Sequence, residues 1–141
     1  MVHVIVDCQM AYVPFGPVLE AIERELDAAK AKGEPIVLLE YYYGGPTYEH
    51  ILDKLHGYGK FARAVKRTFG GANEVIEACV KRGWEMAKFR ITGAETYCCV
   101  AETSEGLLLA CPDSEQEVVQ DACFDKVFGG PFPRHENIRW V

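Results

Sequence analysis

The sequence predicts an α/β protein: a three-layer α/β/α sandwich around a mostly parallel, Rossmann-like central sheet. Short apolar segments rich in β-branched residues alternate with longer segments of helical period along the chain. This alternation is typical of parallel sheets covered by helices on both faces. The 141 residues contain no repeat or low-complexity segment, which indicates a single domain over residues 1–141.

The strand predictions rest on short apolar runs bounded by turn-forming residues. The first run is apolar on both faces, as a buried parallel strand requires. The third segment is the weakest, because its composition also fits a helix. The predicted strands are His3–Asp7, Pro35–Tyr43, Phe61–Lys66, Glu85–Thr92 and Glu117–Asp121, with Ile138–Val141 as a candidate edge strand.

Helices are predicted where apolar residues recur every three or four positions between a start and a stop signal. In the first helix, Pro17 suits the opening turn and Gly33 can cap the end. The tail from Phe128 contains several Gly and Pro residues and is predicted to be irregular. The predicted helices are Pro17–Lys32, Thr47–Leu55, Ala72–Lys81 and Tyr97–Ala110.

The composition indicates which kinds of partner and which cellular location to expect for this protein. A net charge of −6 and the lack of a Lys/Arg block argue against nucleic acid as a partner. No segment approaches the roughly 18–20 apolar residues of a membrane span. The amino-terminal segment lacks a cationic region and a cleavage site, so we expect a cytoplasmic protein without a membrane partner. The six cysteines include no CxxC or zinc-like spacing, and we expect mostly free thiols.

Three reactive residues lie near the carboxyl ends of predicted strands, which is where open parallel sheets bind ligands. They are Asp7, Lys66 and Cys99. Each has a structural alternative when taken alone: Asp7 as a turn cap, Lys66 as a solvated charge, and Cys99 as a small core residue.

Together the three residue types form a workable acyl-transfer set. A helix N-terminus and a nearby cation both lower the pKa of a thiol. A carboxylate can accept the thiol proton and return it to a leaving group, and an ammonium beside that carboxylate offsets the cost of holding either charge in a cleft. Backbone N–H groups between Gly93 and Cys99 can stabilise an oxyanion. Such a site needs neither histidine nor metal.

Motifs around these residues resemble those of the isochorismatase-like cysteine hydrolases. VIVDCQMAY resembles the opening of that family, where Asp-x-Gln precedes an aromatic residue, and VKRTFGG resembles the segment that carries its catalytic Lys. GAETYCCVAET resembles the turn Gly-x-x-Thr-x-x-Cys-Val, and EVVQDACFD the following strand with Asp-Ala. The resemblance spans residues 2 to about 125. The matching residues are Asp7, Gln9, Tyr12, Lys66, Phe69, Gly93, Thr96, Cys99 and Val100.

The resemblance implies a role for each matching site residue. Asp7 would be the general base, Lys66 its cationic partner and Cys99 the nucleophile. It also implies a cis peptide before Glu95, with the backbone N–H groups of Glu95 and Cys99 as the oxyanion hole. Cys98 is then a neighbouring small residue.

The region after the second strand departs from the family. Nicotinamidases hold a metal there through an Asp and histidines, but this chain has Tyr41 and Tyr43, and His50 and His56 are six positions apart. We therefore predict no metal and no cofactor, which argues against a nicotinamidase. This region is also short, which would leave the pocket open or require a neighbouring subunit to close it.

Aromatic residues near the predicted site are assigned to substrate binding: Tyr12, Tyr41, Tyr43 and Phe69. Strand alternation would place Tyr41 and Tyr43 in a pocket and Tyr42 in the core. The alternative is that the tyrosines simply pack over a helix.

The sequence thus predicts a hydrolase that cleaves an amide- or ureide-type C–N bond of a small-molecule substrate through an acyl-enzyme, and we expect a homo-oligomer. One alternative is a non-catalytic member that binds a partner or oligomerises through the tyrosine-rich surface. A second is an isochorismatase-type ether hydrolase, against which Cys99 argues, and a third is a thiol-based redox sensor.

Overall fold

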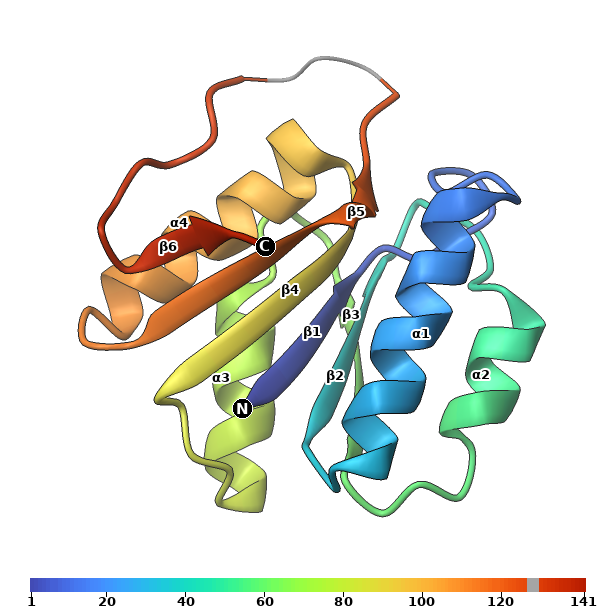
Figure 1. Cartoon of the computed structure of the whole chain (residues 1–141), viewed down its shortest axis with the longest axis horizontal. Helices are drawn as coiled ribbons and strands as arrows, with labels where there is room; N and C mark the ends of the chain where they lie inside the picture. Colours follow the sequence, from blue (N-terminus) through green and yellow to red (C-terminus); the bar gives the residue numbers. More distant parts are fainter. Residues whose placement is uncertain (127–129) are drawn as a thin grey trace.

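The computed structural model describes residues 1–126 and 130–141 and shows a sheet between two layers of helices (Figure 1). Its six strands lie in the order β3-β2-β1-β4-β5-β6, and each described pairing is parallel. The predicted α/β/α fold is therefore confirmed. The strands are β1 (Val2–Val6), β2 (Ile36–Tyr41), β3 (Phe61–Lys66), β4 (Lys88–Ala94), β5 (Glu115–Phe124) and β6 (Ile138–Trp140).

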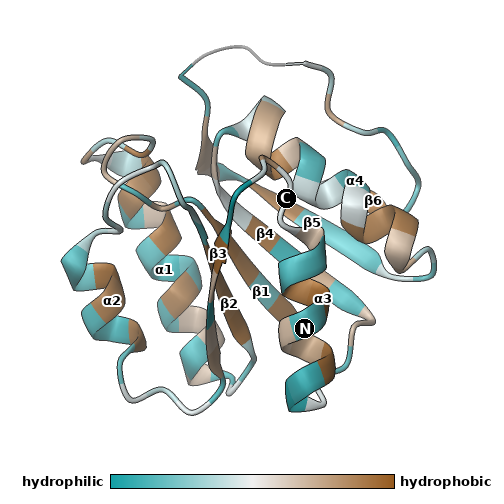
Figure 2. Ribbon diagram, turned by 180° about the vertical axis from the view of Figure 1, so that it is seen from behind, coloured by the Kyte–Doolittle hydropathy of each residue, from teal (hydrophilic) through white to brown (hydrophobic). Residues whose placement is uncertain are grey.

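Helices cover both faces of the sheet. The helices α1 (Pro17–Ala31) and α2 (Glu49–Leu55) lie on one face, and α3 (Ala72–Arg82) and α4 (Ala101–Ala110) on the other (Figure 1). Every residue of β1 is buried, because its side chains alternate between an apolar cluster under α3 and α4 and one under α1 and α2. Figure 2 shows hydrophobic residues concentrated on β1 and β2, as a sheet covered on both faces requires.

Several predicted boundaries need correction. β2 ends at Tyr41, and Tyr42 is 54% exposed, so the expectation that Tyr42 enters the core is wrong. Its ring instead lies 4.1 Å from the Arg67 guanidinium carbon. The helix predicted from Tyr97 begins with a wide π-helical turn, Thr96–Val100, before α4.

The segment 61–66 is a strand rather than a helix, and the predicted edge strand is present as β6. Of the tail predicted to be irregular, Phe128 and Gly129 lie outside the described residues, and residues 130–137 contain no helix or strand. None of the described helices is long and apolar enough to cross a membrane.

The order of the strands creates a switch point between β1 and β4. The first three strands build outward from β1 in one direction, and β4 then pairs with the other edge of β1. Gly93 makes this contact close: it has φ 120°, and a Cβ there would lie 1.9 Å from the Val6 carbonyl oxygen. The turn after β4 is thereby held against the end of β1, which is the position where ligands bind in open parallel sheets.

Candidate active site

Asp7 and Lys66 form a buried ion pair at the carboxyl edge of the sheet. Asp7 follows β1 directly and Lys66 is the last residue of β3, so both reach across the end of the intervening β2. Lys66 Nζ lies 2.9 Å from Asp7 Oδ2, and the two side chains are 0% and 1% exposed. Charges this deeply buried are tolerated in proteins when they are paired and hydrogen-bonded.

The loop after β3 completes the surroundings of the Lys66 ammonium. Nζ donates to the carbonyl oxygens of Thr68, at 3.2 Å, and Phe69, at 2.8 Å. With Asp7, these acceptors match the three donors of an ammonium. Gly71 allows this loop to pack closely against the Leu39 and Lys66 side chains, because a Cβ at Gly71 would lie 2.4 Å from Leu39 Cδ1 and 3.0 Å from Lys66 Cδ.

Cys99 lies beside this pair, in the turn after β4, and is 8% exposed. Asp7 Oδ1 makes no conventional hydrogen bond in the described part of the chain. The Cys99 thiol lies close enough to lower the pKa of the Asp7 carboxyl. The structure therefore brings Asp7, Lys66 and Cys99 together, and their catalytic roles stay a prediction.

Burial dominates the protonation of both Asp7 and Cys99. Desolvation raises the pKa of Asp7, although the Lys66 ammonium opposes this shift. Desolvation and the negative charge of Asp7 raise the pKa of the Cys99 thiol well above its usual range, and Lys66 only partly offsets them. The cation thus favours the thiolate without outweighing burial, so the pKa of Cys99 stays above that of a free thiol.

The turn that carries Cys99 contains the peptide geometry that the resemblance implies. The Ala94–Glu95 bond is cis. The Glu95 carbonyl accepts hydrogen bonds from the N–H groups of Cys98, at 3.1 Å, and Val100, at 3.0 Å. The roles of the Glu95 and Cys99 N–H groups in an oxyanion hole remain predictions.

The aromatic residues assigned to substrate binding meet around Tyr41. Its ring centroid is 6.4 Å from that of Tyr12, 5.5 Å from that of Tyr43 and 5.8 Å from that of Phe69. Lys66 Nζ lies 5.0 Å from the Tyr41 centroid, so the cluster adjoins the ion pair. Tyr43 and Phe69 are exposed at 66% and 49%. Contact with a substrate remains a prediction.

Gln9, which matches the family motif, has a structural role that the sequence does not reveal, and Thr103 is not among the predicted site residues. The Gln9 amide accepts from Tyr41 N–H at 2.9 Å and donates to the carbonyl oxygens of Tyr41 and Gly45 at 2.9 and 2.7 Å. The Gln9 side chain thereby takes the place of a strand neighbour at the end of β2, beyond the last residue of β1.

Thr103 is wholly buried, and its hydroxyl donates to the Cys99 carbonyl oxygen. Its only sequence signal is a hydroxyl one helical turn after the nucleophile.

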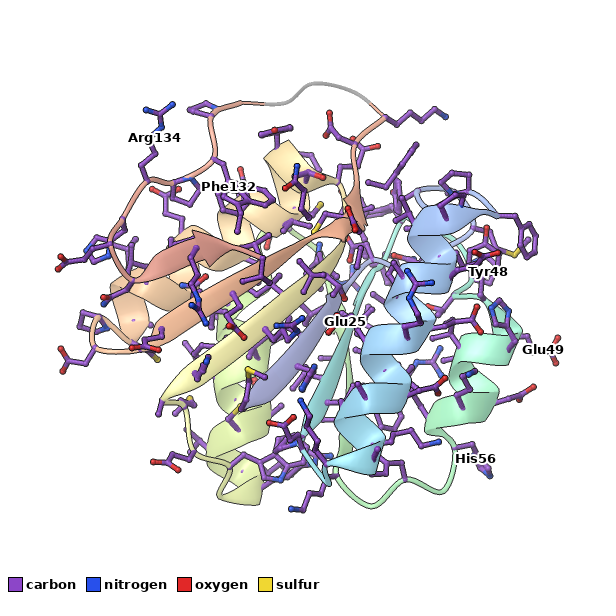
Figure 3. The ribbon with its side chains drawn as sticks, in the orientation of Figure 1. Glu25, Tyr48, Glu49, His56, Phe132 and Arg134 are labelled. Carbon is purple, nitrogen blue, oxygen red and sulfur yellow. The ribbon has the colours of Figure 1, made fainter. Side chains whose placement is uncertain are left out.

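The histidines considered for a metal lie apart from the ion pair. His50 Nε2 is 3.5 Å from Glu23 Oε1, and His56 lies at the far end of α2 from the carboxyl edge (Figure 3). No group of three or more His, Cys, Asp or Glu residues is arranged to hold a metal ion in the described ranges. That the site works without a metal stays a prediction.

A separate hollow of about 720 Å³ lies between the Thr96–Tyr97 turn, the end of β5 and the segment before β6. Figure 3 shows Phe132 and Arg134 on that segment, away from α1 and α2. The residues lining this hollow do not include Asp7, Lys66 or Cys99. We place the candidate active site at the ion pair rather than here, because the reactive groups meet there.

Comparison with solved structures finds the same fold in several hydrolases. A nicotinamidase from Staphylococcus aureus has a TM-score of 0.76 and 11% identity, covering 89% of this chain and 84% of its own. An N-carbamoylsarcosine amidase from Thermoplasma acidophilum has a TM-score of 0.71 and 13% identity, covering 89% of this chain and 84% of its own. An isochorismatase from Pseudomonas putida has a TM-score of 0.65 and 17% identity, covering 86% of this chain and 69% of its own.

No protein-family model matches the sequence, and no curated protein sequence matches it. At these levels of identity, the likeness to solved structures concerns the fold. The chain has the α/β fold of the isochorismatase-like hydrolases, which confirms the predicted resemblance at the level of architecture.

Proposed function

We propose that this chain is a cysteine hydrolase that cleaves an amide- or ureide-type C–N bond of a small molecule, with Asp7, Lys66 and Cys99 as its catalytic set. The observation that carries the proposal is the buried Lys66–Asp7 pair at 2.9 Å, with the Cys99 thiol close enough to Asp7 to lower the pKa of its carboxyl. The fold shared with a nicotinamidase and an N-carbamoylsarcosine amidase supports this substrate class.

Acylation begins from a thiol and a carboxylate. The raised pKa of Asp7 makes it a stronger base than a free aspartate, and Oδ1 has no competing conventional bond in the described residues. As Asp7 takes the Cys99 proton, the sulfur attacks the carbonyl carbon and the carbonyl oxygen becomes an oxyanion. Backbone N–H groups of Glu95 and Cys99 stabilise this oxyanion.

Collapse of the tetrahedral intermediate breaks the C–N bond. Asp7 delivers its proton to the departing nitrogen, and a thioester remains on Cys99. Water then attacks the thioester while Asp7 accepts a proton from that water, and the acid product leaves as the proton returns to the Cys99 sulfur. The Lys66 ammonium stabilises Asp7 each time it becomes a carboxylate.

The aromatic cluster supplies the binding surface in this proposal. Tyr12, Tyr41, Tyr43 and Phe69 offer apolar faces beside the Lys66 ammonium. Faces of this kind hold the non-reacting part of a small substrate and exclude water from the thioester. We propose this function for a cytoplasmic homo-oligomer without a metal or other cofactor.

The test is turnover of a panel of small amides, ureides and imides, read by release of the amine or ammonia. Mass spectrometry of quenched reactions should detect the thioester on Cys99. Cys99→Ala should lose both signals, whereas the matched Cys98→Ala variant should retain them, because Cys98 is the adjacent thiol without a catalytic role. Full activity in Cys99→Ala would exclude the mechanism.

A second candidate, a non-catalytic binding or oligomeric protein, is favoured by the exposed rings around the site. Tyr42, Tyr43 and Phe69 are 54%, 66% and 49% exposed, and exposed apolar groups in one region mark interaction surfaces. The absence of any acyl adduct across the panel, together with ordinary reactivity of Cys99, would favour this candidate. An ether hydrolase would instead turn over vinyl ethers in Cys99→Ala.

A further inference from the structure

A single buried hydroxyl joins the loop that holds Lys66 to the turn that holds Cys99. Thr103 lies in α4 and is 0% exposed. Its Oγ1 donates to the Cys99 carbonyl oxygen at 2.7 Å and accepts from the Gly71 N–H at 3.0 Å. The two bonded groups belong to segments that are connected in sequence only through α3 and β4.

The loop on the Gly71 side is the one that positions the ammonium. Its Thr68 and Phe69 carbonyl oxygens accept hydrogen bonds from Lys66 Nζ. The same loop rests on the start of α4, since a Cβ on Gly70 would lie 3.4 Å from Glu102 Cβ. A shift of this loop relative to α4 would therefore move Lys66 relative to Cys99.

We propose that Thr103 is a positioning residue that sets the separation between the Lys66 ammonium and the Cys99 sulfur. The proposal rests on the proposed function, in which Lys66 stabilises the Asp7 carboxylate that takes the Cys99 proton. Many helical threonines bond only to a carbonyl one turn earlier, and such a bond serves the helix alone. The second bond, to Gly71, is what extends the role of Thr103 to the site.

The experiment compares Thr103→Val, which keeps the shape and removes the hydroxyl, with Thr103→Ser, which keeps the hydroxyl. Ser104→Ala is the matched control. Ser104 is the next residue of α4 and equally buried, but its hydroxyl donates to Gln116 Oε1 of β5 at 2.5 Å, away from Lys66. All variants are checked by thermal unfolding, so that a general loss of stability is recognised.

Two readouts are taken on each variant. The first is the pH–rate profile of Cys99 alkylation by iodoacetamide, resolved by peptide mass mapping. The second is hydrogen exchange of the Gly71 amide measured by NMR, which reports the Thr103 bond whether or not the protein is an enzyme. NMR is used because it resolves the exchange of a single amide, and the Thr103 bond involves only the Gly71 N–H.

Loosening Lys66 in Thr103→Val weakens the cation that favours the thiolate. We expect Cys99 alkylation near pH 8 to slow by roughly fivefold, the effect of about one hydrogen bond, and the profile to move to higher pH. Gly71 exchange should accelerate. Thr103→Ser should restore both readouts, and Ser104→Ala should leave both near wild type.

Equal slowing in Ser104→Ala and Thr103→Val would overturn the proposal, as would fast Gly71 exchange with an unchanged Cys99 profile. A wild-type Cys99 that is insensitive to Asp7→Asn would count against the proposed function instead. In that case the Gly71 exchange would still show whether Thr103 ties the loop to α4, so the two failures are distinguishable.

Discussion

Replacing Lys66 by Met should destabilise the protein in a strongly pH-dependent way. Met keeps most of the side-chain stem but removes the charge opposite Asp7. At 2.9 Å, an ion pair in a medium of effective dielectric constant near 20 is worth about 6 kcal/mol of attraction. Asp7 would then be a buried carboxylate without a counter-charge, which proteins avoid by protonation.

Protonation of Asp7 limits the loss of folding free energy in Lys66→Met. An aspartate with the ordinary pKa of 3.8 costs about 4 kcal/mol to protonate at pH 7 and about 1.4 kcal/mol less for each unit of pH below that. Without Lys66, burial and the nearby Glu40 charge both raise the pKa of Asp7 in the folded state. A raised folded-state pKa contributes stability at low pH that is lost as the pH rises.

Urea unfolding of Lys66→Met and wild type at pH 5 and pH 7 measures this effect. We expect the variant's deficit to be larger at pH 7 than at pH 5, by at most about 3 kcal/mol for one proton over two pH units. The double variant Asp7→Asn/Lys66→Met should lose that pH dependence, because residue 7 no longer titrates. Lys54→Met, which breaks the exposed pair with Asp27, should have little effect at either pH. A deficit in Lys66→Met that is equal at both pH values would refute the buried ion pair.

Three further predictions concern the site and the strands that support it. Asp7→Asn removes the charge that raises the pKa of Cys99, so Cys99 alkylation near pH 8 should accelerate while amide turnover falls; parallel changes in the two rates would contradict the role of Asp7 as base. Gly93→Ala should fail to accumulate as folded protein, judged by circular dichroism, because its Cβ would meet the Val6 carbonyl oxygen at 1.9 Å. Gly45→Ala is the control: it also has positive φ but has nothing within 4 Å of the added Cβ, and it should cost only about 1–2 kcal/mol. Gln9→Leu removes the amide that bonds the end of β2 and should lower the free energy of unfolding by about 2–3 kcal/mol in urea titrations; an unchanged midpoint would show that these bonds are dispensable.

Much of the architecture can be read from local patterns. Residues 4–6 are apolar at successive positions, as a strand buried on both faces requires, and β1 is such a strand. Pro17 at the start of α1 and Gly33 just beyond its end bound that helix in the sequence as in the structure. The boundaries are less predictable. Tyr42 continues an apolar run, but β2 ends before it, at Tyr41, whose N–H bonds to the side chain of Gln9, thirty-odd positions earlier.

For the site, the sequence by itself determined which residue types stand at the ends of the strands: an acid after β1, a lysine at the end of β3 and a cysteine after β4. The tertiary structure decided how they interact. Burial explains why the pKa of Cys99 is raised despite the nearby ammonium, since desolvation depends on the surrounding chain. Only packing reveals Thr103, because Gly71 and Cys99 become neighbours through the contact between α4 and the loop after β3. Local sequence carries residue identity, while distance and dielectric environment arise from contacts between remote segments.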